Sequence, residues 1–329
     1  MGYNKENYQR IRSEYETKPF RAQEAADVRR REVYAIIPQV KRLDDQLAQF
    51  GLRLFQASLH GENVEEETAL LHAENARILK ERAALLKANG YPADYTEPQY
   101  ECKECGDSGF VGIKMCACMR RRLTEAGMAS SGLSALMRKQ SFDNFSLDYY
   151  RKNEREFRIM EHNYKTARKY AEQFNMDSDP EKRSGSLLFV GGTGLGKTHL
   201  STSIAREVIE RGYDVFYNTA LGMISDYQFN RFKTGTAPAD GDNTERYERC
   251  DLLIIDDLGT EVINQFTVSC IYRVIDTRLN MNKPTIISTN LTSSELLKAY
   301  NDRITSRLMG EYIVLPFYGT DVRQQKLKE

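Results

Sequence analysis

The sequence lacks a net charge and lacks long apolar runs. Its 329 residues include 47 basic and 47 acidic side chains, so any attraction to nucleic acid must come from a local patch. No apolar run approaches the ~18 residues that a membrane-spanning helix needs, and the N-terminal M-G-Y-N-K-E-N-Y lacks the apolar stretch of a signal peptide. Glu6 stands where an N-myristoylation signal has Ser or Thr. We therefore expect a cytoplasmic protein without a membrane span.

Glycine is nearly absent before Gly51 and is concentrated in the stretch S-L-L-F-V-G-G-T-G-L-G-K-T-H, which begins at Ser186. The apolar run Leu187–Val190 predicts a strand buried on both faces. The following glycines fit G-x-x-x-x-G-K-[ST], a loop whose backbone N–H groups surround phosphate oxygens at the start of a helix. Lys197 would reach the terminal phosphates of a nucleoside triphosphate, and Thr198 would bind Mg²⁺. The predicted phosphate-binding residues are Gly191, Gly192, Thr193, Gly194, Leu195, Gly196, Lys197, Thr198 and His199.

A second buried strand ends in two acidic residues. The apolar run Leu252–Ile255 precedes Asp256 and Asp257, and α/β sheets bind ligands at the carboxyl ends of their parallel strands. Asp256 would hold Mg²⁺ through water, and Asp257 is a candidate general base or water-positioning group. The alternative for Asp257 is an exposed acid that caps the following loop. A further strand, Pro284–Asn290, ends in an amide, Asn290, that could orient the attacking water.

Strands and helices alternate through the C-terminal part of the chain. The other elements predicted there are strands 214–218 and 314–317 and helices 151–174, 201–211, 220–232 and 262–279. This alternation, with a phosphate loop after the first strand, predicts an α/β fold with a doubly wound parallel sheet. Residues 234–243 are rich in Gly, Pro and Asp and predict an exposed loop. Phe142 and Phe145 either flank the adenine base or anchor this domain.

Residues 4–99 have a helical pattern rich in Arg, Glu, Gln and Ala. Apolar side chains recur there at alternating steps of three and four, as in a helix that lies along another helix. They are Val33, Ile36, Val40, Leu43, Leu47, Phe50 and Leu54. Pro38 predicts a kink or the start of a second helix, and a turn at 59–63 and a helix at 64–89 complete an antiparallel hairpin. The hairpin either packs only on itself or is a docking surface for a partner protein.

Four of the six cysteines lie within residues 102–118, as a C-x-x-C pair and, after a glycine-containing hairpin, a C-x-C pair. In a reducing compartment this pattern indicates a metal rather than disulfides, and four thiolates suit a closed tetrahedral zinc site. The zinc ligands would be Cys102, Cys105, Cys116 and Cys118. An iron–sulfur cluster and free or redox-active thiols are the alternatives. Cys250 and Cys270 are predicted to be packed thiols.

Arginines are clustered in two further places. The run Arg120–Arg122 is either a solvated face or a phosphate contact, and it precedes a small, polar segment at 124–140 that predicts a linker. Arg303 and Arg307 are four residues apart and so lie on one face of a predicted helix.

Four motifs follow one another along the chain: G-G-T-G-L-G-K-T, L-L-I-I-D-D-L-G, I-I-S-T-N and D-R-I-T-S-R-L. Together they resemble the AAA+ ATPases, specifically the DnaC/DnaI type of bacterial replicative helicase loader and its relative, the IstB transposition helper. The resemblance covers residues 140–325. The cysteine knuckle behind a helical N-terminal region is similar to the DnaI branch, where that region grips the hexameric helicase. IstB-like proteins lack such a knuckle.

The resemblance implies roles for the motif residues. They fall to Lys197 and Thr198 (phosphate and Mg²⁺), Asp256 and Asp257 (acidic pair), Asn290 (sensor 1), Arg307 with Arg303 beside it (arginine finger for a neighbouring subunit) and Arg323 (sensor 2). Many AAA+ proteins have Asp-Glu where this chain has Asp-Asp, and the shorter second carboxylate reaches water less well. The resemblance therefore implies a slow, switch-like ATPase.

The resemblance also implies a division of the chain and a function. The expected segments are a helical hairpin or coiled coil for helicase binding at 1–99, a four-cysteine zinc knuckle at 100–123, a linker at 124–140 and an AAA+ ATPase domain at 141–329. The implied function is loading of a DnaB-type replicative helicase onto single-stranded DNA, with self-association through the AAA+ domain and with ATP, Mg²⁺ and Zn²⁺ as cofactors. Alternatives are an IstB-like transposition or prophage accessory ATPase and a nucleotide-gated adaptor without significant hydrolysis. A P-loop small-molecule kinase is disfavoured because nothing indicates an acceptor pocket.

Overall fold

The computed structural model describes residues 3–59, 64–135, 137–232 and 244–327. The chain forms two compact units, one of residues 12–119 and one of residues 1–11 together with 120–329. The turn predicted at 59–63 and the loop predicted at 234–243 lie outside the described residues, apart from Leu59, which ends a helix. None of the described helices is long and apolar enough to cross a membrane.

The described chain begins with the helices α1 (Lys5–Ile36), α2 (Pro38–Leu59) and α3 (Val64–Ala88). α2 begins at Pro38, where a missing N–H costs nothing, which confirms the predicted start of a second helix. Asp44 near the start of α2 pairs with Arg82 near the end of α3 at 2.5 Å. Arg53 pairs with Glu74 at 3.0 Å toward the other end of α2. The helices α2 and α3 are therefore antiparallel.

A small hairpin separates the two cysteine pairs. Its strands are β1 (Phe110–Val111) and β2 (Lys114–Met115), which are antiparallel. The helix α4 (Ala117–Ser130) then begins inside the second pair, so Cys118 lies in its first turn.

The other unit is built on a sheet that has five strands among the described residues, in the order β4-β5-β6-β3-β7. The strands are β3 (Ser186–Val190), β4 (Val215–Thr219), β5 (Leu252–Leu258), β6 (Thr285–Thr289) and β7 (Tyr312–Pro316). All neighbouring strands are parallel, which confirms the predicted α/β class. The strand before the phosphate loop, β3, lies inside the sheet between β6 and β7.

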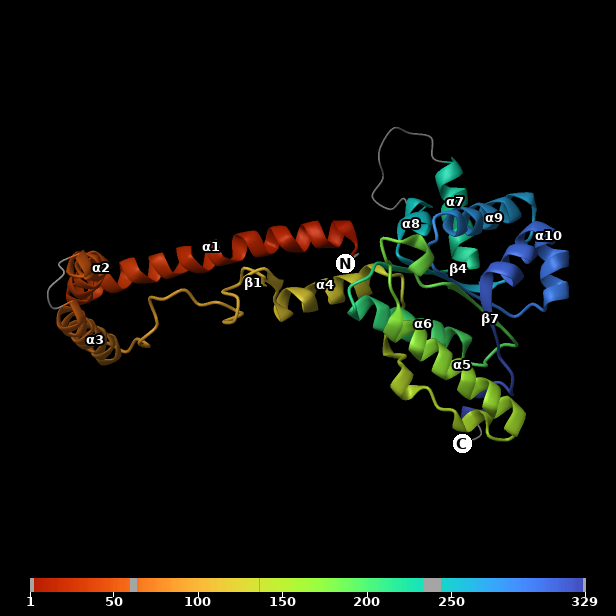
Figure 1. Cartoon of the computed structure of the whole chain (residues 1–329), viewed down its shortest axis with the longest axis horizontal. Helices are drawn as coiled ribbons and strands as arrows, with labels where there is room; N and C mark the ends of the chain where they lie inside the picture. The colour runs from red at the N-terminus through yellow and green to blue at the C-terminus, as the bar shows by residue number, and fades with distance from the viewer. Residues whose placement is uncertain (1–2, 60–63, 136, 233–243, 328–329) are drawn as a thin grey trace. The chain divides into compact units, whose positions relative to one another are not determined.

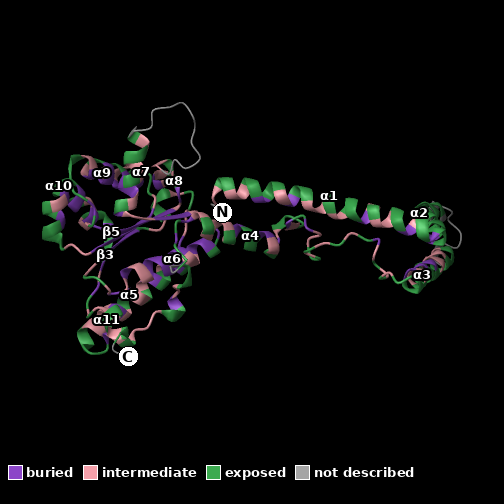
Figure 2. Ribbon diagram, turned by 180° about the vertical axis from the view of Figure 1, so that it is seen from behind, coloured by how far each residue is buried: buried purple, intermediate pink, exposed green. Residues whose placement is uncertain are grey.

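Helices cover both faces of this sheet, so it is doubly wound (Figure 1). α5 (Glu154–Gln173) and α6 (Lys197–Glu210) pack on one face, where Leu187 and Phe189 point. The helices on the other face, where Leu188 points, are α7 (Ala220–Phe232), α8 (Thr244–Arg249), α9 (Gln265–Asn280) and α10 (Ser293–Glu311). Alternate residues of β3 thus enter two cores, and Figure 2 shows the buried residues along the strands.

Short helices connect these elements. The 3₁₀ helices are η1 (Met137–Lys139), η2 (Phe142–Asn144), η3 (Asp148–Tyr150) and η4 (Pro180–Lys182), and the helix α11 (Val322–Lys326) follows β7.

Residues 124–140, the expected linker, begin with the second half of α4 and then contact the edge strand β4. The carbonyl of Ser131 accepts a hydrogen bond from the N–H of Tyr217 at 2.7 Å. Gly132 has a φ of 84°, and a Cβ there would lie 2.2 Å from the carbonyl oxygen of Tyr217. Both the backbone angle and the lack of space therefore require glycine at this position.

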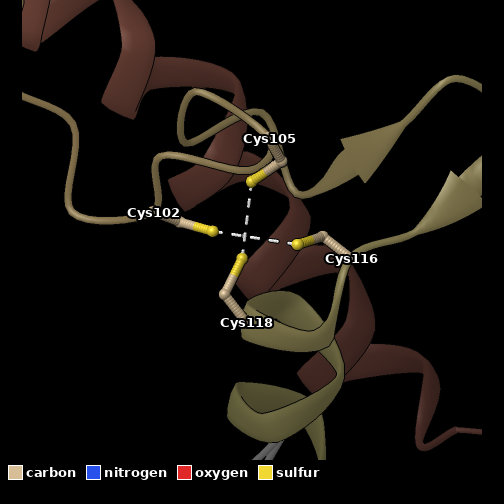
Figure 3. Close-up of side chains that lie close together, drawn as sticks. All are labelled: Cys102, Cys105, Cys116 and Cys118. Atoms are coloured by element: carbon tan, nitrogen blue, oxygen red, sulfur yellow. Dashed lines mark hydrogen bonds between the residues drawn. The ribbon is translucent and has the colours of Figure 1, made fainter.

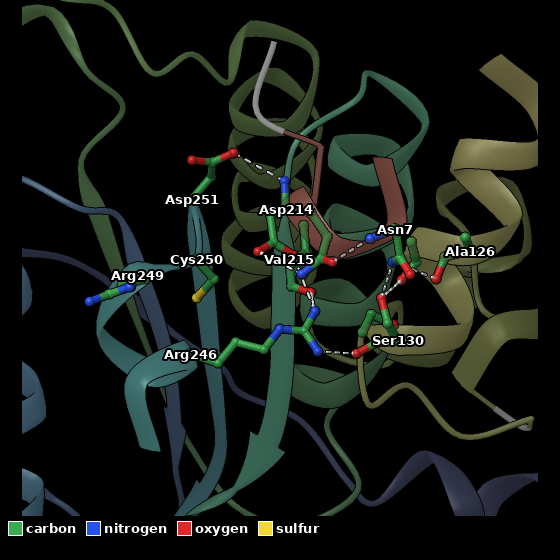
Figure 4. Close-up of polar contacts among 12 residues, drawn as sticks. Asn7, Ala126, Ser130, Asp214, Val215, Arg246, Arg249, Cys250 and Asp251 are labelled. Carbon is green, nitrogen blue, oxygen red and sulfur yellow. Dashed lines mark hydrogen bonds and ion pairs between the residues drawn. The ribbon is translucent and has the colours of Figure 1, made fainter. Parts of the chain in front are cut away.

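Two side chains fasten the end of α4 beside β4 (Figure 4). Arg246 of α8 donates to the carbonyl oxygen of Ser130 and to Oδ1 of Asp214, the latter at 3.1 Å. Asn7 of α1 donates to Oγ of Ser130 at 2.8 Å and to the carbonyl oxygen of Ala126 at 3.2 Å. These contacts explain why the first residues of α1 and the last turns of α4 belong to the same unit as the sheet.

Candidate functional site

The glycine loop connects β3 to the N-terminus of α6. Gly194 and Gly196 have positive φ values of 70° and 88°, a region that residues with a Cβ rarely adopt. Added Cβ atoms would lie 1.9 Å from the carboxylate of Asp321 at Gly194 and 2.8 Å from the ring of Phe145 at Gly196. α6 begins at Lys197, so the free N–H groups of its first turn face the loop, as an anion site requires.

Lys197 is held at this loop. Its Nζ donates to the carbonyl oxygens of Gly191 and Gly192, at 2.5 and 2.7 Å, and to Oδ1 of Asn290 at 2.5 Å. Burial lowers the pKa of Lys197, and nearby acidic groups oppose this shift. The structure therefore brings the predicted lysine and the predicted asparagine together although they are distant in sequence.

Asp256 is a buried carboxylate that accepts hydrogen bonds from three hydroxyl groups. Its Oδ2 accepts from Oγ1 of Thr198 at 2.8 Å and from the hydroxyl of Tyr217 at 2.7 Å. The hydroxyl of Ser288 donates to Oδ1. A hydroxyl and a carboxylate side by side are hard oxygen donors of the kind that Mg²⁺ prefers, so the residues present fit this ion.

Asp257 adopts a positive φ of 55°, which is uncommon for a residue other than glycine. Its N–H donates to Oγ of Ser288 at 2.9 Å, and its carbonyl accepts from Oγ1 of Thr260 at 2.9 Å. Burial raises the pKa of the Asp257 carboxyl and Asp256 adds to this shift, whereas Lys197 and Arg323 oppose it. The following loop is thus tied to the backbone of Asp257 and leaves the carboxylate for other contacts.

A hollow of about 560 Å³ lies beside the phosphate loop. It is lined by Ser146, Asp148, Tyr149, Lys152, Thr320, Asp321, Gln324 and Gln325. It adjoins the loop because Asp321 lies against Gly194, and the N–H of Val322 donates to the carbonyl of Gly194 at 2.9 Å. This hollow has room for the nucleoside part of a nucleotide.

Phe142 and Phe145 pack among other aromatic residues. Phe142 is buried and lies edge-on to Tyr164, with ring centroids 5.8 Å apart. Phe145 stacks on Tyr164 and on Tyr150, with centroids 5.7 and 6.1 Å apart. These contacts favour the anchoring role over contact with the base.

The three predicted arginines lie in different surroundings. Arg323, on α11, is near enough to Lys197 and Asp257 for its charge to lower the pKa of both groups. Arg307, on α10, donates through Nε to Asp276 at 3.0 Å and through a terminal nitrogen to the Tyr272 hydroxyl at 2.9 Å. Both partners are on α9. Arg303 is exposed one turn before Arg307.

Several residues of the site escaped sequence reasoning. Tyr217 and Ser288 lie inside strands, and nothing in their spacing predicts that both contact Asp256. Glu261 and Tyr300 are joined by a buried hydrogen bond, and Glu261 also accepts from the N–H of Gly259, in the turn after the acidic pair. The sequence indicates only weakly that Glu261 belongs near the site: it follows Asp257 by four residues, so the short turn between them keeps the two close.

The second candidate site is the cysteine cluster (Figure 3). The Sγ atoms of Cys102, Cys105, Cys116 and Cys118 all lie within 4.8 Å of one another. Two of the Sγ–Sγ distances, 3.8 and 3.5 Å, are close to the ~3.8 Å edge of a tetrahedron with ~2.3 Å zinc–sulfur bonds. The cluster could therefore hold zinc. Cys250 and Cys270 are buried elsewhere, as predicted for packed thiols.

Backbone groups support the first pair of thiols. The carboxylate of Asp107 accepts from the N–H groups of Glu101 and Cys102 at 2.9 and 2.8 Å. The N–H of Cys105 stabilises the Cys102 thiolate and lowers its pKa to about 7, whereas burial raises the pKa of Cys118 to about 12. A dication supplies the charge that allows four neighbouring thiolates.

The fold and the nucleotide site define a class. β6 lies between β5, which carries the acidic pair, and β3, which precedes the phosphate loop, and a polar residue follows β6. This arrangement makes the unit a P-loop module of the AAA+ type. Residues 161–325 match the family model described as IstB-like ATP binding protein. The chain belongs to this family.

Similar proteins include the replicative helicase loader DnaC of Escherichia coli (strain K12), which is 26% identical over 178 residues. That match covers 54% of this chain and 66% of DnaC, just under two thirds of that relative. The phage-like element PBSX protein XkdC of Bacillus subtilis (strain 168) is 26% identical over 241 residues, 68% of this chain and 85% of XkdC.

Solved structures with some similarity include the crystal structure of the DnaC helicase loader, at 21% identity and a TM-score of 0.46. The matched region covers 56% of this chain and 100% of the DnaC chain in that crystal structure. The crystal structure of DnaI has 18% identity and a TM-score of 0.43 over 58% of this chain and 94% of that chain.

Proposed function

We propose that this protein is an ATP-dependent loader of a DnaB-type replicative helicase onto single-stranded DNA. The observation that carries the proposal is a divided site. Lys197 lies at the phosphate loop and is acted on by the charges of Asp257 and Arg323, whereas the side-chain partners of Arg307 are on α9. A site that needs an arginine from a second chain couples nucleotide binding to assembly. The similarity to the helicase loader DnaC supports a helicase as the partner.

In this proposal the loop N–H groups and Lys197 bind the phosphates of ATP. Thr198, and Asp256 through water, hold Mg²⁺, which neutralises charge on the phosphates. Asp257 accepts a proton from the attacking water or positions it, and Asn290 orients that water. An aspartate reaches less far than a glutamate, so hydrolysis is slow and acts as a switch. Arg323 contacts the terminal phosphate.

Arg307 enters the site of the neighbouring subunit, with Arg303 beside it. It must first leave Asp276, which pairs with it at 2.7 Å while both side chains remain about one third exposed. Ion pairs of this exposure contribute about 0–1 kcal/mol. The contact with the Tyr272 ring adds about 0.5–1 kcal/mol. Self-association around ATP can offset a cost of this size.

The N-terminal segments supply the partner contacts in this proposal. Residues 1–99 hold the helicase, and the cysteine knuckle within 100–123 binds a structural zinc ion through four thiolates. Residues 124–140 join them to the ATPase domain at 141–329. The assembled ATPase domains contact single-stranded DNA through positive groups that follow its backbone. Hydrolysis then releases the loader.

Co-purification with the host's replicative helicase, with and without ATP, tests the proposal directly. ATP-dependent capture is the expected result. Capture of a transposase instead would favour an accessory ATPase, an alternative that the similarity to XkdC over 85% of that protein supports. Binding without ATP turnover, even with DNA and helicase present, would favour a nucleotide-gated adaptor.

Arg307→Ala tests the shared arginine. The variant should bind a fluorescent ATP analogue normally and lose the hydrolysis that self-association stimulates. Arg273→Ala is the matched control, since Arg273, on α9, is also paired with a carboxylate, that of Glu248, at 2.9 Å. Unchanged turnover in Arg307→Ala would remove Arg307 from this role.

A further inference from the structure

The helix α10 consists of two halves that meet at Asn301. This residue has a φ of 74° and a ψ of 173°, which are not helical. Its Oδ1 accepts hydrogen bonds from the N–H groups of Arg303 and Ile304, at 3.0 and 3.3 Å, and so caps the second half. Arg303 and Arg307 both belong to this second half. Their position therefore depends on what holds the chain at the break.

The residue directly before the break is Tyr300. It is fully buried, and its hydroxyl donates to Oε1 of Glu261, which is 6% exposed. Burying a carboxylate costs free energy unless the carboxylate is hydrogen-bonded. A phenylalanine would fill the position of Tyr300 equally well, so packing alone does not require its hydroxyl. The paired polar groups therefore indicate a specific connection rather than simple filling of the core.

Glu261 is itself fixed to the turn that follows the acidic pair. Its Oε2 accepts from the N–H of Gly259 at 3.0 Å. The carbonyl of Leu258, the last residue of β5, accepts from Oγ1 of Thr289 at 2.7 Å, and Thr289 directly precedes Asn290. Glu261 thus connects the end of β5, where the nucleotide is processed, to the break in α10.

We infer that Glu261 and Tyr300 are positioning residues for the arginines that a subunit presents to its neighbour. The Glu261–Tyr300 pair fixes the second half of α10 relative to the acidic turn of the same chain. Arg307 is thereby held in the position from which it reaches the phosphate site of the neighbouring subunit. This inference rests on the proposed sharing of Arg307 between subunits. It predicts that loss of the pair impairs the neighbour's site and spares the subunit's own.

A mixing experiment with full-length chains separates these effects. Asp257→Asn supplies arginines but cannot hydrolyse ATP, and Arg307→Ala supplies a complete phosphate site without its arginine. Each alone should be inactive, and their mixture should regain hydrolysis at the interface that combines both intact parts. Tyr300→Phe is then added to one chain or to the other. It removes a single hydroxyl and retains the ring.

Tyr300→Phe in the Asp257→Asn chain should lower the activity of the mixture about tenfold or more, because a displacement near 1 Å can cost up to about 100-fold. The same change in the Arg307→Ala chain should leave the activity of the mixture within about twofold. Tyr247→Phe is the matched control. It removes a buried tyrosine hydroxyl that donates to Asp226 at 2.5 Å, and it should have no such dependence on the chain that carries it.

Glu261 provides a second, independent pair of variants. Glu261→Gln can keep both contacts, because its amide oxygen accepts from the N–H of Gly259 and its NH₂ donates to the Tyr300 hydroxyl oxygen, so it should retain most of the activity. Glu261→Leu has a similar volume without either contact and should reproduce the loss. Thermal unfolding of each chain shows whether it is folded. Equal losses in both arrangements, or none in either, would overturn the positioning role. Failure of the unmodified pair to regain hydrolysis would instead remove the shared arginine, and the inference together with it.

Discussion

Asp256 illustrates how much of this site depends on single hydroxyl groups. Three of them, from Thr198, Tyr217 and Ser288, donate to one buried carboxylate. Thr198 is a predicted ligand of Mg²⁺, so the other two have a different effect. They hold the carboxylate in one orientation.

Tyr217→Phe should therefore weaken Mg²⁺-dependent ATP binding by about tenfold, since groups that orient a metal ligand have effects of about 10- to 100-fold. Binding of a fluorescent ATP analogue, titrated with Mg²⁺, measures this change. Tyr247→Phe, which acts on Asp226 rather than on Asp256, is the control. An unchanged Mg²⁺ midpoint in Tyr217→Phe would limit Tyr217 to packing.

The acid side of the pH profile should report Asp257. Burial raises the pKa of this carboxyl, and Asp256 adds to the shift. Because the ionised form accepts the proton, hydrolysis should decline as the pH falls through this raised pKa, above the ~3.9 of an ordinary aspartate. Arg323 opposes the shift, so Arg323→Gln should move the acid limb to higher pH. A kcat profile for both chains tests this, and a limb that does not move would contradict the assignment.

At the residue scale, the sequence predicted the parts of the site that have a fixed local spacing. Lys197 and Thr198 follow from the glycine pattern, and Asp256 follows from its place after an apolar run. Tyr217 could not be predicted in this way, because its contact with Asp256 depends on the register of β4 against β5. That register is set by the whole sheet.

At the scale of elements, the strands were predictable and the break in α10 was not. Apolar runs mark the buried strands, and each predicted strand overlaps an observed one by most of its length. The motif N-D-R-I-T-S-R-L has an unbroken helical pattern, and asparagine at its start is an ordinary helix cap. Nothing local indicates that Asn301 takes a φ of 74° between two helical halves.

Asn301 combines two opposing effects that substitutions can separate. Its backbone region is one that residues other than glycine occupy at a cost of about 1–3 kcal/mol, while its cap contributes about 1 kcal/mol. Asn301→Ala should lower the free energy of unfolding by about 1 kcal/mol, because the cap is lost and the strain stays. Asn301→Gly loses the cap but relieves the strain, so it should be nearly neutral or stabilising. Urea unfolding gives both values, and a glycine variant less stable than the alanine variant would contradict the argument.

The cysteine knuckle is an element whose stability should depend on zinc. It has two very short strands and a few buried side chains, too little to fold without an added constraint. Elemental analysis should find one zinc ion per chain, and Cys105→Ser should lose it. Cys250→Ser removes a thiol outside the cluster and should retain the metal. Bound iron, or no metal in the unmodified chain, would point to one of the other cysteine chemistries.

At the scale of the whole molecule, the two compact units suggest that partner binding and ATP binding can be lost separately. Cys102→Ser with Cys105→Ser removes half of the cluster in residues 12–119, whereas the phosphate loop lies in the other unit. The double variant should therefore bind a fluorescent ATP analogue with unchanged affinity and fail to co-purify with the replicative helicase. Cys250→Ser with Cys270→Ser, two buried thiols of the ATPase unit, is the control and should keep helicase binding. Full helicase capture by the zinc-free chain would show that the helices within residues 1–99 hold the helicase without an intact knuckle. Loss of ATP binding in that chain would show that the knuckle and the ATPase unit form one cooperative structure. Unchanged ATP binding together with lost helicase binding is therefore the result that separates the two activities.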